Sequence, residues 1–408
     1  MKHRIDPASA AVGAAIAGAT FLLTSFQLTA TATNVVPPEW FPILGKMSLV
    51  QLPDGTGGTV ETLRISGCNL QVVNGLGSTT TKNGLGNLIV GYNETGNSFG
   101  DDRTGSHNLC VGSRNTYASC AGAVLSFDNS SLADYATVTG GTINRASGLY
   151  ASTSGGSVND AQGEYATCAG GQDSRANGLG STVAGGRNHF AGGMWATIAG
   201  GNLSSASGRD SSVFGGGDHT ASGSSSTVVG GQLATASGAV STVVGGESNA
   251  ATGTASLAAG GRDNRAEGRA SRVGGGRFNK ADGDYAVVVA GQDNTASGTS
   301  AAVVAGELNQ ASGFGASVVA GESNVASGSR AAVVGGESNL AGRDALGNLG
   351  VNTVVVGGES NQAIDTWCTV LGGRDNVAGN LAPALTALGA AIGGRCGLNA
   401  AFNCVFLP

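Results

Sequence analysis

The chain has 408 residues, of which 72 are glycine, 5% are aromatic and 12% are charged, and its net charge is −6. Glycine without a three-residue period and only 7 prolines exclude collagen, while β-branched residues at fixed positions argue against disorder. The acidic balance argues against a nucleic-acid partner, because phosphate binding needs clustered Lys and Arg.

Residues 1–32 are predicted to be a signal peptide. Lys2–Arg4 supplies a positive start, Ala8–Phe26 is largely apolar, and Ala30–Ala32 is a small-residue cleavage site. The alternative is an uncleaved membrane anchor, since the apolar run is just long enough to span a bilayer. We therefore expect a secreted or cell-surface protein with no membrane span in the mature chain.

Two irregular segments precede the repeats. Residues 33–85 are predicted to form an N-terminal linker and cap strands, the strands lying within Leu63–Gly75. Residues 86–135 are predicted to form degenerate coils with inserted loops, notably Asn97–Ser106. Capping coils should depart from the consensus, because an open solenoid end exposes strand edges and core.

Residues 136–342 contain a strict repeat. A Gly-Gly or Ala-Gly pair recurs fourteen times at a spacing of 15, with Ala five residues after it and Ala or Ser five residues before it. The consensus is (Ala/Ser)-x-Val-x-Gly-Gly-x-x-Asn-x-Ala-Ser-Gly-x-x. The second glycines of these pairs are Gly141, Gly156, Gly171, Gly186, Gly201, Gly216, Gly231, Gly246, Gly261, Gly276, Gly291, Gly306, Gly321 and Gly336.

Each repeat can hold only two short strands and two turns. Small or β-branched residues alternate with variable ones at the period of a strand, and glycine pairs permit a tight corner. Each strand must then pair with its equivalent in the next repeat, about 4.8 Å away. The predicted fold is an all-β, single-chain parallel β-solenoid, or β-roll, of 15-residue coils with irregular capping segments at both ends.

The Asn position of the repeat predicts a structural ladder, in which side-chain amides bond along the axis and to turn backbone. An active-site interpretation is disfavoured, because catalysis needs one site and not a ladder. His189 and His219 occupy the same column roughly 10 Å apart, too far to share a metal, and are interpreted as substitutions within a turn. The predicted ladder residues are Asn249, Asn264, Asn279, Asn294, Asn309, Asn324 and Asn339.

The first strand of the repeat is apolar on both faces, which predicts that both are covered. We expect its outer face to pack against copies of the chain, with the oligomer face formed by Val287, Val289, Val304, Val319 and Val334. A Thr column on this strand raises ice binding as an alternative, which is disfavoured because the neighbouring column is mainly Ala and Val.

The end of the chain loses the strict period. Residues 343–394 are predicted to be interrupted solenoid coils, and residues 395–408 a C-terminal cap. The seven cysteines include two candidate disulfide pairs, Cys110 with Cys120 and Cys396 with Cys404, whereas Cys168 and Cys368 are expected to be buried small side chains.

Chemistry-bearing motifs are scarce, and we predict no catalytic, cofactor-binding or metal site and no cofactor. The histidines have no convincing triad partner. Asp101–Arg103 lies in an inserted loop, and the Gly-rich segment Asp54–Gly58 lacks the Lys of a phosphate loop and is interpreted as a turn. Glutamates after the glycine pairs, interrupted by arginines, are interpreted as a solubilising ridge.

The repeat resembles the head repeats of YadA-like trimeric autotransporter adhesins, over about residues 136–373. The resemblance implies a β-roll, a homotrimer, and adhesion to extracellular matrix or neighbouring surfaces. Each coil is one residue longer than the family's, and no coiled-coil stalk or C-terminal barrel anchor is evident. We expect a non-catalytic protein of adhesion or surface assembly. The alternatives are a carbohydrate-binding or polysaccharide-processing β-helix, which paired carboxylates in the inserted loops would favour, and a structural fibre component.

Overall fold

The computed structural model describes residues 41–342, 350–379 and 390–391. The chain divides into two units, Met1–Gln71 and Val72–Pro408. The predicted signal peptide, the C-terminal cap, and the pair Cys396 and Cys404 lie outside the described residues.

The first unit contains an antiparallel hairpin. The single-turn helix α2 (Phe41–Leu44) is followed by β1 (Met47–Pro53) and β2 (Thr59–Ile65), which pair along their whole length. The carboxylate of Asp54 closes the turn by accepting the backbone N–H groups of Thr56 and Gly58 at 2.8 and 2.9 Å. The sequence predicted strands within Leu63–Gly75 that begin or cap the stack; of this range, Leu63–Ile65 belongs to β2, which pairs with β1.

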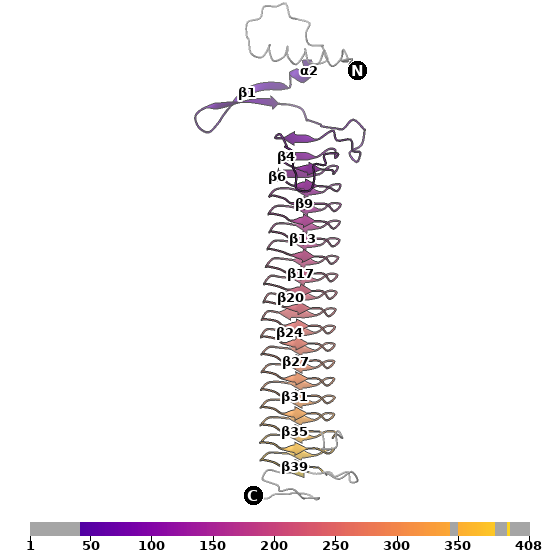
Figure 1. The fold of residues 1–408 in the computed structure, drawn as a ribbon, viewed down its shortest axis with the longest axis vertical. Coiled ribbons are helices and arrows are strands. Elements are labelled where there is room, and N and C mark those ends of the chain that lie inside the picture. The colour runs from indigo at the N-terminus through magenta and orange to yellow at the C-terminus, as the bar shows by residue number, and fades with distance from the viewer. Residues whose placement is uncertain (1–40, 343–349, 380–389, 392–408) are drawn as a thin grey trace, which may run out of the picture. The chain divides into compact units, whose positions relative to one another are not determined.

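The second unit is a parallel β-solenoid, whose coils stack into the long column in Figure 1. Its first sheet contains, among the described residues, β3 (Leu88–Val90), β4 (Leu109–Ser113), β6 (Ala123–Phe127), β8 (Thr137–Val138), β10 (Ser152–Thr153), β12 (Thr167–Cys168), β14 (Thr182–Val183), β16 (Thr197–Ile198), β18 (Ser212–Val213), β20 (Thr227–Val229), β22 (Thr242–Val244), β24 (Leu257–Ala259), β26 (Arg272–Val273), β28 (Val287–Val288), β30 (Ala302–Val303), β32 (Ser317–Val318), β34 (Ala332–Val333), β36 (Val354–Val355), β38 (Thr369–Val370) and β40 (Ala390–Ala391).

The second sheet contributes one two-residue strand per coil. Its described members are β5 (Thr116–Tyr117), β7 (Ser130–Ser131), β9 (Arg145–Ala146), β11 (Asp160–Ala161), β13 (Arg175–Ala176), β15 (Phe190–Ala191), β17 (Ser205–Ala206), β19 (Thr220–Ala221), β21 (Thr235–Ala236), β23 (Ala250–Ala251), β25 (Arg265–Ala266), β27 (Lys280–Ala281), β29 (Thr295–Ala296), β31 (Gln310–Ala311), β33 (Val325–Ala326), β35 (Leu340–Ala341), β37 (Gln362–Ala363) and β39 (Val377–Ala378).

The register confirms the predicted stacking of 15-residue coils. Val288 pairs with Val303 in the first sheet, and Ala296 pairs with Ala311 in the second. A third line of parallel bridges, from Phe127 to Arg374, joins the short segment between the two sheets. Where the sequence period is interrupted, Ala332 pairs with Val354, so the stack continues in register beyond the interruption.

The interior consists of three narrow columns of small side chains. The Val column, the Ala or Ser column before it and the Ala column of the second sheet are fully buried in nearly every described coil. Cys168 and Cys368 lie in these columns and are buried, as predicted. Core Val and Ala side chains leave little space between the sheets, which is why the apolar content of the chain is mostly Ala and Val.

The predicted disulfide between Cys110 and Cys120 is wrong, because both residues are buried free thiols. Cys110 occupies the interior column of β4, in register with Val124, whereas Cys120 lies beyond β5 and is bridged to Ser106. The two cysteines are close in sequence, but their side chains lie in different columns of the coil.

Glycine is required in two columns by the close approach of successive coils, and in one of them also by the backbone conformation. A Cβ on Gly223 would lie 2.0 Å from the carbonyl oxygen of Gly238 in the next coil, so the close approach of the coils excludes any side chain. The second glycine of each pair meets the same obstacle and also has positive φ, as at Gly336 (φ +90°). The first glycine of the pair faces open space at Gly335. This explains why that position is Ala at Ala290.

We predict opposite outcomes for alanine at the two members of one pair. Gly336→Ala should destabilise the solenoid by about 3 kcal/mol, because its Cβ would meet the Gly358 carbonyl oxygen in a left-handed backbone conformation. Gly335→Ala should be neutral. Denaturant unfolding of both variants measures the difference, and equal loss of stability would contradict the assigned roles.

We also predict that Ala296→Leu disrupts its coil far more than Thr295→Val. Ala296 is fully buried between Ala281 and Ala311, so added volume would force the sheets apart at a cost of roughly 1–3 kcal/mol. Thr295 is half-buried and points outward. Thermal melting of the two variants provides the comparison, and similar melting temperatures would show that the register is misassigned.

Candidate functional site

The Asn column forms a buried hydrogen-bonded ladder. Asn294 is representative: its Oδ1 accepts the backbone N–H of Asn309 at 3.0 Å, and its Nδ2 donates to the carbonyl oxygens of Ala290 and Gly306 at 3.2 and 2.8 Å. All seven ladder residues named from the sequence are almost fully buried. Each amide therefore joins a glycine corner to the next coil and is occupied by backbone, which leaves it no capacity for a ligand.

The Asn ladder is interrupted in the middle of the solenoid. Between Asn159 and Asn249 the column holds Ser174, His189, Ser204, His219 and Ala234, all in the same register. Both imidazoles are buried in the column that the sequence assigned to them, each directly after a bend of the chain.

We predict that Asn294→Ala destabilises the solenoid by about 2–4 kcal/mol, because it removes three hydrogen bonds and leaves the Asn309 N–H buried without its acceptor. Gln310→Ala is the matched control, since Gln310 is an exposed residue on the outer face of the next coil. The midpoint of chemical denaturation measures both. A shift of equal size in the two variants would show that the ladder adds no stability.

An apolar ladder lies on the outer face of the first sheet. Its members are exposed large side chains at one position of successive coils, broken only by Ala259 and Gly274. In the preceding coils the same position holds small or polar residues, from Thr139 to Ala199. The apolar ladder comprises Phe214, Val229, Val244, Val289, Val304, Val319, Val334, Val356 and Leu371.

The structure separates the predicted oligomer face into two positions. Val289, Val304, Val319 and Val334 belong to the apolar ladder and are 41–48% exposed. Val287 lies at the other outward position of the strand, beside Ala302 of the next coil. It is half-buried and therefore less exposed than the valines of the apolar ladder. Sequence reasoning did not identify Phe214, Val356 and Leu371 as members of the apolar ladder. The available signal was the 15-residue spacing, which the insertion shifts for Val356 and Leu371.

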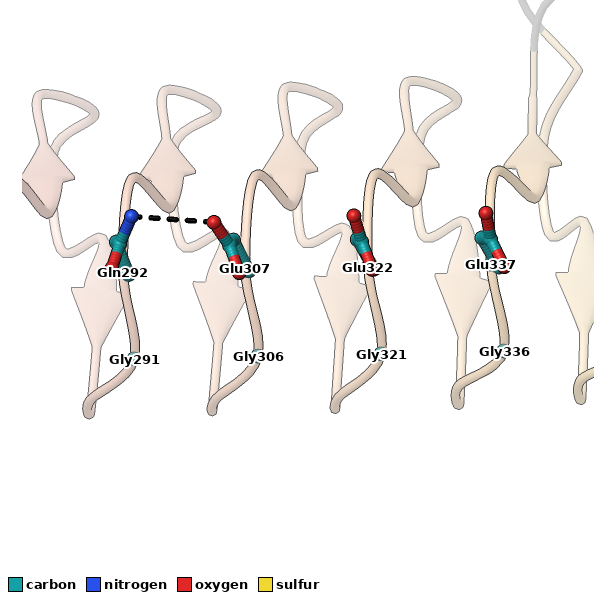
Figure 2. A pocket seen from close by; sticks show the side chains of 8 residues that line it. All are labelled: Gly291, Gln292, Gly306, Glu307, Gly321, Glu322, Gly336 and Glu337. Carbon is teal, nitrogen blue, oxygen red and sulfur yellow. Dashed lines mark hydrogen bonds between the residues drawn. The ribbon is translucent and has the colours of Figure 1, made fainter.

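An acidic ladder, Glu307, Glu322, Glu337 and Glu359, lies three residues further along each coil. Figure 2 shows the first three side chains projecting in the same direction from successive coils, above the glycine corners that line a shallow open groove. Gln292 donates to Glu307 at 3.2 Å, and Arg374 pairs with Glu359. Glu322 and Glu337 have no ion-pair partner within the described coils, so their in-register charges repel each other.

The inserted loop at Asn97–Ser106 is held in place by hydrogen bonds to carboxylates. Asp101 accepts the backbone N–H groups of Gly96–Asn97, and these bonds lower the pKa of its carboxyl. Asp128 accepts both the N–H and the hydroxyl of Ser98, at 2.6 and 2.7 Å, which ties the loop to the coil beneath it. These contacts show that the carboxylates of Asp101 and Asp128 anchor the loop.

Sequence reasoning missed an aromatic stack at one turn. Tyr135, Tyr150 and Tyr165 lie in consecutive coils with ring centroids 4.9 and 5.1 Å apart and nearly parallel planes. Their 15-residue spacing was the signal that could have found them. Because the rings cover each other's faces, the stack presents mainly ring edges to solvent, which is unsuitable for stacking against a sugar.

The described part of the chain contains no group of three or more His, Cys, Asp or Glu side chains that could hold a metal ion. It also contains no helix with the length and apolar character needed to cross a bilayer. Comparison of the chain with protein-family models gives no match, and comparison with curated proteins gives no significant match.

Proposed function

We propose that this chain is a secreted or cell-surface β-roll that acts without catalysis in adhesion or surface assembly, and that it self-associates through the apolar ladder. The resemblance of its repeat to YadA-like adhesin heads supports a homotrimer and an extracellular matrix or surface ligand. The solenoid supplies a long, regular scaffold for such a role.

The apolar ladder is the observation that carries this proposal. Exposed valines recur along one face at the rise of the coil, about 4.8 Å, from Val289 to Val334 and beyond. A contiguous apolar face of this length is a typical interaction surface. A second copy of the solenoid has the same spacing, so side chains of two copies can interdigitate over many coils; a globular partner lacks this periodic match.

Closed association is favoured by the narrowness of the ladder. One apolar column per chain can meet its equivalents around a common axis, which buries every copy equally and leaves no unsatisfied surface to propagate. The acidic ladder, three residues away across the glycine corner, stays outside the contact, as in the coil that contains Val304 and Glu307. It keeps the assembled particle soluble through net negative charge.

Sedimentation at micromolar concentration tests the proposal. The protein should have the mass of a small closed oligomer, with three chains as the expected number. Replacing Val289, Val304, Val319 and Val334 together by Thr should weaken association by roughly 30-fold, because four half-exposed apolar side chains become polar without a change of shape.

The control makes the same substitution on the other sheet. Val325 and Val377 point outward from β33 and β39, and Val325→Thr with Val377→Thr should leave the mass unchanged. A monomeric parent protein, or equal dissociation in the control variant, would contradict the proposal that the chain self-associates through this face.

A further inference from the structure

The two buried histidines take the place of two amides of the Asn ladder and keep the acceptor bond, whereas their Nε2 atoms have no hydrogen-bond partner among the described residues. The Nδ1 of His189 accepts the backbone N–H of Ser204 at 3.2 Å, and the Nδ1 of His219 accepts that of Ala234 at 3.2 Å. These are the bonds that Asn Oδ1 makes one coil onward elsewhere, as from Asn294 to Asn309. The imidazole thus continues the ladder through a nitrogen lone pair.

The second ring nitrogen occupies the place of the amide nitrogen. A Cβ built on Gly186 would lie 2.2 Å from His189 Nε2, and one built on Gly291 would lie 2.4 Å from Asn294 Nδ2. Gly216 stands in the same relation to His219. Since Nδ1 must keep its lone pair to accept, the proton resides on Nε2 and both imidazoles are neutral.

Protonation is incompatible with this arrangement. An imidazolium carries hydrogen on both nitrogens and can accept no hydrogen bond. The N–H groups of Ser204 and Ala234 would then face another N–H inside the core, each buried and without an acceptor. The charge itself would be placed where the two side chains are 2% and 1% exposed.

We propose that His189 and His219 form an acid-sensitive break in the middle of the solenoid, closed when both are neutral and loosened when they are protonated. This acid-sensitive break lies where the Asn ladder has the fewest side-chain hydrogen bonds between coils. No Asn side chain bridges the coils from Ser174 to Ala234, so the imidazoles carry the only side-chain acceptors that reach Ser204 and Ala234 within the described residues.

The surroundings of the two imidazoles contain little charge. The facing strands β14, β16, β18 and β20 contribute Val or Ile, and the ladder neighbours are Ser or Ala. Cys168, whose thiol contacts the Ser174 carbonyl, stays neutral because burial raises its pKa to about 12. The charged side chains on these coils are exposed, and among them only Asp218 acts on an imidazole, that of His219. They are Asp173, Arg175, Arg187, Asp218, Arg209 and Asp210.

Burial lowers the pKa of both histidines below the ordinary value of 6.5. The unfolded chain therefore binds more protons than the folded chain once the pH falls below about 6.5. The stability of these coils is complete above that pH and decreases as the pH drops toward the lowered folded-state pKa. Acidification, and not alkalinisation, opens the break.

Hydrogen exchange of the intact protein at pH 7.5 and pH 5, expressed as protection factors, tests the proposal. Protection over residues 189–234 should fall roughly tenfold at pH 5, the effect of losing one buried hydrogen bond per histidine coil. Protection over residues 279–339, where Asn fills every ladder position, should not change.

The double variant His189→Asn with His219→Asn restores the residue used elsewhere in the column, so it should fold and lose the pH dependence. His107→Asn, the same change at the other described histidine, should retain it; His107 bonds Thr79 and Asn74 outside the ladder. Acid-induced loss of protection that persists in the double variant, or constant protection in the parent protein, would overturn the proposal.

Discussion

The whole structure depends on the in-register pairing of each coil with the next. Backbone N–H groups of one coil donate to C=O groups of the next, as from Val287 to Ala301, and this holds equivalent residues in register, so each position of the repeat becomes a column along the axis. The gap is too narrow for a Cβ at two positions, which selects glycine there in the regular coils. The remaining columns are either exposed on the outer faces or buried, and the buried ones hold small side chains or the Asn ladder.

Stacking identical residues also multiplies their properties. A single exposed valine is unremarkable on a protein surface, but Val304, Val319 and Val334 in adjacent coils make a continuous apolar line. The four glutamates of the acidic ladder make a line of repelling charge, moderated at its ends by Gln292 and Arg374. The candidate functional features of the solenoid are therefore linear, and its shallow open groove also runs across successive coils. A linear apolar surface is suited to a partner with the same period, which is why self-association follows more directly from this fold than ligand binding does.

The Asn ladder shows how the same constraint can be modulated. Substituting His for Asn keeps the acceptor in place at neutral pH, since Nδ1 replaces Oδ1 with little change of geometry. An amide has no accessible proton equilibrium, whereas an imidazole does. The column therefore stays uniform in shape while two of its positions acquire a dependence on pH that the others lack.

Periodicity alone determined the fold class, the 15-residue coil, the interior Val and Ala columns and the buried Asn column, because a strict repeat admits one stacking. Tertiary structure decided the rest. It placed Cys110 and Cys120 in different columns, assigned β2 to a hairpin with β1, and carried the ladder across the insertion after Gly342. It also decided that Val287 and Val289 differ in exposure, and that His189 accepts a backbone hydrogen bond. The physical reason is that a repeat specifies which residues stack, whereas the direction and partner of each side chain depend on the coil's corners and on the atoms of the coil above.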